Sequence, residues 1–278
     1  MPKKNTAIAI VYDFDGTLAQ GNIQENSFIP NLGLTTTDFW KEVKEITKEN
    51  EMDEILAYMY LLIEKAKEKK VSCKKEKIKE HGQSVKYFEG VEQYFARINQ
   101  YAKDKCIDLT HYIISSGTKE MIEGTSIATE FKCIFASSFK YDHEGVPEWP
   151  ALAINYTTKT QYLFRINKGI YNAWDNSSIN KYTSPQKRPI LFENMIYIGD
   201  GATDIPAMKM LNYQGGTSIA VYSPETKEAK EKAQELLQND RANYVAKADY
   251  SDGSEIDQIL KSILNQISTK ASVEQYTK

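Results

Sequence analysis

Acidic residues that directly follow short apolar runs are the part of this sequence best suited to chemistry. Asp13 and Asp15 follow the apolar run 7–12, and Asp200 and Asp204 follow the run 195–198. Carboxylates held close together repel one another unless a cation lies between them. Mg²⁺ takes oxygen ligands, and proteins usually bind it through one or two carboxylates together with substrate phosphate oxygens. The four acids therefore predict a magnesium site that serves a phosphorylated substrate.

The Asp13–Asp15 pair suits phosphoryl chemistry. One carboxylate of such a pair can attack phosphorus and form an aspartyl phosphate. The other can protonate the leaving group and later activate water. Gly16 follows the pair and permits a turn that a larger residue would resist.

A transferred phosphoryl group also needs groups that stabilise its negative charge. Ser115 offers a hydroxyl, and Ser116 and Gly117 offer backbone N–H groups after another apolar run. Lys159 offers a cation at the start of a predicted helix, and Lys168 is the alternative near the end of that helix. Each of these short motifs alone is more typical of a turn or a surface residue, so their shared position after predicted strands is what gives them weight.

Apolar runs that alternate with helical patterns indicate how these residues are positioned. Strands are predicted at 7–12, 106–115, 132–137, 195–198 and 218–222, helices at 119–127, 160–170 and 256–267, a hairpin within 139–156 and a loop at 172–189. Such alternation predicts an α/β fold with a Rossmann-like parallel sheet and right-handed crossovers. Ligands of these sheets bind beyond the carboxyl ends of the strands, where the acids lie.

Residues 21–84 differ from the rest of the chain. Apolar residues recur there at helical spacing, as in Phe39, Val43 and Ile46, and no strong strand pattern is present. We therefore expect a core made of residues 1–20 and 85–278, with an all-helical cap domain, residues 21–84, inserted after the first strand.

The composition limits the partners and the location. The chain has 278 residues, a net charge of -3, 41% hydrophobic residues and 26% charged residues, which is ordinary for a globular protein. The near-neutral charge argues against nucleic acid as a partner. No apolar stretch is long enough for a membrane span, and the run 7–11 is too short for a signal peptide. Cys73, Cys106 and Cys133 fit neither a disulfide framework nor a zinc site, so we expect a cytoplasmic protein with free thiols. The sequence gives no indication of oligomeric state.

Four segments resemble the signatures of the haloacid dehalogenase-like (HAD) hydrolase superfamily. Residues 11–18 (VYDFDGTL) are similar to the first signature and 113–117 (IISSG) to the second. Lys159 matches the third and residues 198–204 (IGDGATD) the fourth. The dehalogenase members lack the second Asp of the first signature, so Asp15 favours phosphoester chemistry.

The resemblance implies a role for each matching residue. Asp13 would be the nucleophile and a Mg²⁺ ligand, whereas Asp15 would be the acid/base and would ligate Mg²⁺ through its main-chain carbonyl. Asp200 would ligate Mg²⁺ directly. Asp204 would act from outside the ligand set, through water or by orienting Lys159.

The same resemblance assigns the phosphate contacts. Ser115, Ser116 and Gly117 would bind the phosphoryl oxygens, and Lys159 would stabilise Asp13 and the transition state.

The helical segment resembles the cap of the phosphoserine-phosphatase-like branch. In that branch a cap Glu contacts the substrate, which makes Glu25 a candidate specificity residue. Trp40, Tyr58 and Tyr60 are expected in the cap core, and His81, His111 and His143 are expected to be structural or surface residues. The predicted function is a magnesium-dependent phosphatase for a small phosphorylated metabolite. A phosphotransferase using the same site, or a catalytically silent regulatory relative, is the alternative.

Overall fold

The fold is built on a seven-stranded sheet with strand order β4-β3-β2-β1-β5-β6-β7. The computed structural model describes residues 5–225 and 227–274. All neighbouring strands are parallel except β3 and β4, which form an antiparallel hairpin. The predicted α/β fold is therefore confirmed. The strands are β1 Thr6–Tyr12, β2 Ile107–Thr118, β3 Phe131–Tyr141, β4 Pro147–Leu152, β5 Met195–Gly199, β6 Thr217–Tyr222 and β7 Tyr244–Lys247.

Strand β1 lies at the centre of the sheet, between β2 and β5. Its side chains alternate between two apolar layers, as the period of a strand requires. Ile8 and Ile10 pack into the layer that also contains Leu260, while Ala9 and Val11 pack into the layer that contains Leu163. Burial on both faces explains why this strand reads as an uninterrupted apolar run.

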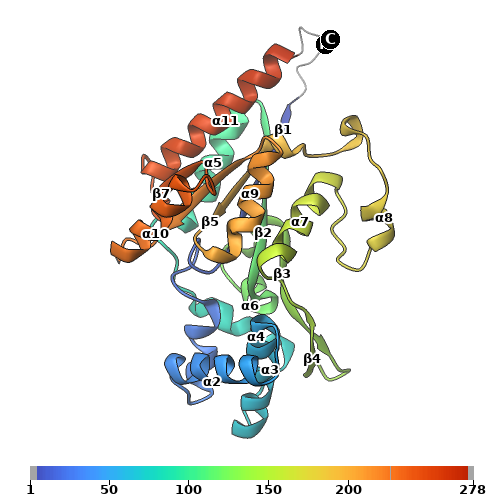
Figure 1. The fold of residues 1–278 in the computed structure, drawn as a ribbon, viewed down its shortest axis with the longest axis vertical. Helices are drawn as coiled ribbons and strands as arrows, with labels where there is room; N and C mark the ends of the chain where they lie inside the picture. The colour runs from blue at the N-terminus through green and yellow to red at the C-terminus, as the bar shows by residue number, and fades with distance from the viewer. Residues whose placement is uncertain (1–4, 226, 275–278) are drawn as a thin grey trace.

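Helices cover both faces of the sheet (Figure 1). α5 and α11 lie on one face, and α7 and α9 lie on the other. The α-helices are α1 Phe28–Asn31, α2 Thr36–Glu49, α3 Glu54–Lys69, α4 Lys75–Glu80, α5 Val91–Asp104, α6 Lys119–Glu123, α7 Tyr156–Lys168, α8 Asn176–Asn180, α9 Ile205–Tyr213, α10 Lys227–Gln238 and α11 Glu255–Glu274. Short 3-10 turns complete the secondary structure at η1 Ile23–Glu25, η2 His81–Ser84, η3 Ala128–Glu130, η4 Pro185–Lys187, η5 Phe192–Asn194 and η6 Ala202–Asp204.

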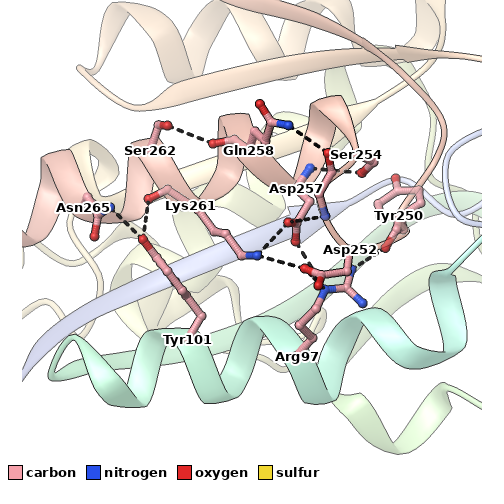
Figure 2. Close-up of polar contacts among 11 residues, drawn as sticks. Arg97, Tyr101, Tyr250, Asp252, Ser254, Asp257, Gln258, Lys261, Ser262 and Asn265 are labelled. Atoms are coloured by element: carbon pink, nitrogen blue, oxygen red, sulfur yellow. Dashed lines mark hydrogen bonds and ion pairs between the residues drawn. The ribbon is translucent and has the colours of Figure 1, made fainter.

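A polar network joins α5 to the start of α11 (Figure 2). Arg97 of α5 donates to the carbonyl of Tyr250 and forms an ion pair with Asp257, which also pairs with Lys261. The Tyr250 hydroxyl in turn donates to the carbonyl of Thr17 at 3.0 Å. Through Tyr250, the network therefore contacts the loop that follows β1 and helps to hold it in place.

Every element between residues 21 and 84 is helical. Helices α2 and α3 form the outer part of this segment, at one end of the sheet beside the β3–β4 hairpin (Figure 1). Asp53 caps α3 by accepting from the backbone N–H groups of Ile55 and Leu56, which removes unsatisfied donors at the helix start. We refer to residues 21–84 as the cap, and their status as a separate domain stays a prediction.

The local predictions differ from the structure in several places. The hairpin is confirmed, but β3 continues through the predicted break near residue 138 to Tyr141. Helix α6 ends at Glu123 instead of residue 127, because Gly124 follows it and the chain then turns. The expected loop 172–189 contains the short helix α8, which Asp175 caps through the N–H of Ser178. Helix α11 is longer at both ends than predicted. Cys73, Cys106 and Cys133 are free thiols, as expected.

Candidate active site

Three of the residues singled out from the sequence lie at the ends of the three central strands of the sheet. Asp13 follows β1, Ser115 lies near the end of β2, and Asp200 follows β5. All three line one cavity of about 570 Å³ between the sheet edge and the cap. The parallel register brings these ends together although the residues are far apart in sequence.

Lys159 joins two of the acids. Its side chain is 0% exposed, and its Nζ lies 2.7 Å from Asp13 Oδ2 and 2.7 Å from Asp204 Oδ1. Asp204 also accepts from the Tyr197 hydroxyl at 2.7 Å and from the Gly201 backbone N–H at 3.2 Å. Three donors thus hold Asp204, which leaves it suited to orienting Lys159.

Opposing effects act on the pKa of Asp13. Burial raises the pKa of Asp13 to about 6, with repulsion by Asp204 adding to the rise, while Lys159 and the Phe14 N–H oppose it. Burial alone would lower the pKa of Lys159, but attraction by Asp13 and Asp204 outweighs it and raises that pKa above its usual value. At neutral pH, Lys159 is therefore charged and Asp13 is mostly ionised.

The side chain of Asp15 lies beside the end of strand β2. Its Oδ1 accepts from the Ile23 N–H at 2.8 Å, and a Cβ added to Gly117 would lie 2.7 Å from its Oδ2. Burial, followed by repulsion from Asp13, raises the pKa of Asp15 to about 8. The two acids of the first motif therefore hold different protonation states near neutral pH, as an acid and a nucleophile require.

The donor set fits a hard divalent cation. Carboxylate oxygens of Asp13, Asp200 and Asp204 lie within 4.8 Å of one another. Desolvation of the carboxylate, then repulsion by Asp204 and Asp13, raises the pKa of Asp200 well above its ordinary value, although the residue stays exposed, so an added positive charge here would be favourable. Gly16 keeps the space beside Asp200 open, since a Cβ at Gly16 would collide with that carboxylate. Of these three acids, Asp13 and Asp200 line the cavity whereas Asp204 is fully buried, so Asp13 and Asp200 are the ones that could contact a metal there.

The segment Ser115–Ser116–Gly117 forms the end of β2 and lines the cavity. Gly117 N–H donates to Ser115 Oγ at 3.0 Å. The Ser116 carbonyl accepts from the hydroxyl of Tyr58 in the cap at 2.7 Å. The backbone of this segment is therefore fixed from two directions.

The two candidate lysines of α7 occupy different places. Lys159 lies in the acid cluster, whereas Lys168 donates to the main-chain carbonyls of Ile179 and Lys181 at 2.5 Å and 2.7 Å. The geometry favours Lys159 as the cation of the site.

The cap residues depart from expectation in part. Glu25 lines the cavity and accepts from the Trp40 indole N–H at 2.5 Å and from the Asn22 amide at 2.7 Å. Trp40 and Tyr58 pack in the cap core as expected, but both also line the cavity. Tyr60 was expected in the cap core, and this is wrong: it is 41% exposed, because it lies on the outer face of α3.

Sequence reasoning missed several residues of the site. Tyr197 lies inside an apolar strand, where its hydroxyl gave no signal. Lys44, Glu54 and Gln24 line the cavity from the cap. Packing of α2 and α3 over the sheet edge brings Lys44 and Glu54 there, whereas Gln24 lies in the short turn η1. His111 is buried and bonded to Tyr12 and Asn99, and His143 is exposed, so neither lies in the acid cluster.

The family profile of haloacid dehalogenase-like hydrolases matches residues 10–209. This chain belongs to that family. An uncharacterized protein of Borreliella burgdorferi is 28% identical, over 92% of this chain and 96% of its own length. No helix in the described part of this family member combines the length and the apolar character needed to cross a bilayer.

Solved structures agree in fold. A HAD-family hydrolase from Salmonella enterica serovar Typhi aligns with a TM-score of 0.59 at 16% identity, covering 94% of this chain and 72% of that one. A phosphoserine phosphatase in its apo form aligns with a TM-score of 0.55 at 17% identity, covering 92% and 98%. An analogue of the phospho-aspartyl intermediate of phosphoserine phosphatase gives a TM-score of 0.54 at 15% identity, covering 93% and 99%.

Proposed function

We propose that this HAD-family hydrolase is a magnesium-dependent phosphatase that acts on a small phosphorylated metabolite through an aspartyl phosphate on Asp13. The observation that carries the proposal is the single lysine ammonium held between Asp13 and Asp204, beside Asp200, at the carboxyl edge of the sheet. The cavity of about 570 Å³ has the size of a small-molecule site.

The first step is transfer to the protein. A carboxylate oxygen of Asp13 attacks phosphorus while the bond from phosphorus to the leaving-group oxygen breaks. Asp15, protonated near neutral pH, gives its proton to that oxygen. Lys159 and the Ser115 hydroxyl stabilise the charge on the phosphoryl oxygens.

The second step returns the site to its starting state. Asp15, now a carboxylate, takes a proton from water, which attacks phosphorus as the bond to Asp13 breaks and inorganic phosphate forms. Asp13, Asp200 and the main-chain carbonyl of Asp15 would hold Mg²⁺, which neutralises charge on the phosphoryl oxygens when bound.

Hydrolysis of p-nitrophenyl phosphate tests the proposal. We expect wild-type activity that requires Mg²⁺ and is lost by about 10³-fold or more in Asp13→Asn, because the nucleophile is removed. Asp108→Asn is the control, since Asp108 is an exposed acid near the opposite end of β2. Acid quenching during turnover should trap phosphate on the peptide that contains Asp13.

Activity that survives Asp13→Asn would contradict the nucleophile assignment. Absence of activity on p-nitrophenyl phosphate and on a panel of phosphorylated metabolites would favour a regulatory relative. Release of less inorganic phosphate than p-nitrophenol, with added alcohols present, would indicate a phosphotransferase.

A further inference from the structure

One cap side chain reaches the phosphate-binding segment of the core. Tyr58 of α3 is only 2% exposed, and its hydroxyl donates to the carbonyl of Ser116 at 2.7 Å. Its ring contacts the Trp40 ring edge to face, with centroids 5.9 Å apart. The side chain is thus fixed at both ends, by packing in the cap and by a hydrogen bond to the core.

The carbonyl that Tyr58 contacts belongs to a peptide group that also donates a hydrogen bond to Ser115. The Ser116 carbonyl and the Gly117 N–H belong to one peptide group, and that N–H donates to Ser115 Oγ at 3.0 Å. A hydrogen bond to a peptide carbonyl polarises the group and strengthens its N–H as a donor. Because Ser115 Oγ accepts this bond, its own hydrogen is left to point at another acceptor.

We propose that Tyr58 is a positioning residue for phosphoryl transfer, acting from the cap through the Ser116–Gly117 peptide on the Ser115 hydroxyl. The inference rests on the proposed function, since the acceptor of the Ser115 hydrogen would be a phosphoryl oxygen. Tyr58 would then affect the phosphoryl group in common to all substrates and not the choice of leaving group.

A second contact links the same helix to Lys159. Asp53, the N-cap of α3, accepts through Oδ2 from the side-chain amide of Asn155. Asn155 is the N-cap of α7, where its carbonyl accepts from the N–H of Lys159 at 3.3 Å. The start of one cap helix therefore contacts both core segments that are proposed to stabilise phosphoryl oxygens.

The test is a double-mutant cycle between Tyr58→Phe and Ser115→Ala. Tyr58→Phe keeps the ring and its packing but removes the donor. We expect kcat for p-nitrophenyl phosphate to fall about 5-fold, the fold-change of one net hydrogen bond, with a small change in KM. In the Ser115→Ala background, Tyr58→Phe should cause almost no further loss, because the group through which it acts is absent.

Tyr60→Phe is the matched control, because Tyr60 lies on the same helix but is 41% exposed. It should match the wild type in every assay. Thermal unfolding of each variant sets a temperature at which all are folded, so that a loss of fold is not read as a loss of positioning.

Binding of inorganic phosphate in the presence of Mg²⁺ gives a readout without turnover. Its affinity should weaken by a similar factor in Tyr58→Phe, and again only when Ser115 is present. Unchanged kcat and phosphate affinity in Tyr58→Phe would overturn the inference, as would additive losses in the double variant. A wild-type protein that hydrolyses no phosphoester would instead overturn the proposed function, and phosphate affinity in the same cycle would still decide the role of Tyr58.

Discussion

The cavity has two walls that differ in how their charged groups are paired. The core wall is the side formed by the ends of β1, β2 and β5, and the cap wall is the side formed by residues 21–84. Directly behind the core wall, Lys159 is fully buried and pairs with Asp13, which lines the cavity, and with the buried Asp204. On the cap wall, Lys44 and Glu54 face the same cavity, yet neither forms an ion pair within the described part of the chain. The core wall is built for one fixed arrangement of charges, and the cap wall leaves charges available to a ligand.

The two walls differ in pairing because the core wall would meet the phosphoryl group and the cap wall would meet the leaving group. Charge that develops during phosphoryl transfer is the same for every substrate, so the groups that meet it gain from being fixed in advance. Leaving groups differ, and groups that select among them need free hydrogen-bonding capacity in the unbound protein. We therefore expect substitutions on the core wall, and of Tyr58 that is bonded to it, to lower turnover of all substrates. Substitutions of the unpaired charged groups on the cap wall should change which substrate is preferred.

Lys159→Met is expected to have the largest effect. It should lower kcat by about 10²- to 10³-fold on every substrate, because a fixed positive charge is lost from the transition state. It should also lower the free energy of unfolding by about 3–5 kcal/mol, since the buried carboxylates of Asp13 and Asp204 lose their partner. Steady-state kinetics and urea unfolding measure the two effects.

Lys168→Met is the control for this variant. Lys168 lies on the same helix and donates to the carbonyls of Ile179 and Lys181, away from the cavity. It should reduce stability without changing kcat. Equal loss of activity in the two variants would contradict the assignment of Lys159.

Glu25→Gln is expected to act on substrate choice. Glu25 Oε1 accepts from Trp40 and Asn22, while Oε2 accepts no hydrogen bond from any described residue and is free to meet a ligand. The change should lower kcat/KM for the best metabolite in a panel by about 10- to 100-fold, as expected for a lost bond to a charged group. Hydrolysis of p-nitrophenyl phosphate should change little. A parallel loss on both substrates would place Glu25 with the core wall instead.

Tyr197→Phe tests whether catalysis depends on the hydrogen bonds that hold Asp204 from outside the cavity. The Tyr197 hydroxyl is one of the donors that hold Asp204, so its loss should let Lys159 shift and lower kcat about 5-fold. Tyr112→Phe removes the hydroxyl of another fully buried strand tyrosine, which bonds Tyr171 at 3.1 Å and no acid among the described residues. That control should leave kcat unchanged, and a matched decrease in both variants would indicate a general loss of packing.

The contrast between the two walls also explains what the sequence predicts well. Asp13, Asp200 and Ser115 lie on or directly after buried parallel strands, and such strands have a strong apolar signal with a fixed edge. The order of β1, β2 and β5 then brings these residues together without further information. The sequence favours Lys159 over Lys168 because a helix is expected to begin beside it, and the structure places it in the first turn of α7.

The cap wall was much less predictable. Trp40 and Lys44 reach the cavity only because α2 docks over the sheet edge, and helical spacing identifies a buried face without saying what covers it. Tyr60 shows the limit directly, since an aromatic residue in a helix full of apolar residues proved to be exposed. Polar side chains inside apolar strands, such as Tyr197, carry no periodic signal at all.

The smallest expected effect is on the pH dependence of stability and concerns His111, in strand β2 outside the cavity. Burial lowers the pKa of His111 to about 3, and its ring nitrogens bond the Tyr12 hydroxyl at 3.0 Å and Asn99 at 2.8 Å. The folded protein therefore keeps this ring neutral, whereas the unfolded chain binds a proton below its ordinary pKa of about 6.5. Stability from this group is complete above that value and is lost as the pH falls toward 3.

The loss should be measurable close to neutral pH. Between pH 7 and pH 6, proton binding by the unfolded chain should remove about 0.7 kcal/mol from the free energy of unfolding. His111→Gln has no such proton to bind, so its urea unfolding should be less pH-dependent by that amount. An identical pH dependence in the two proteins would mean that His111 is protonated equally in the folded and unfolded states. The core would then not keep this buried ring neutral.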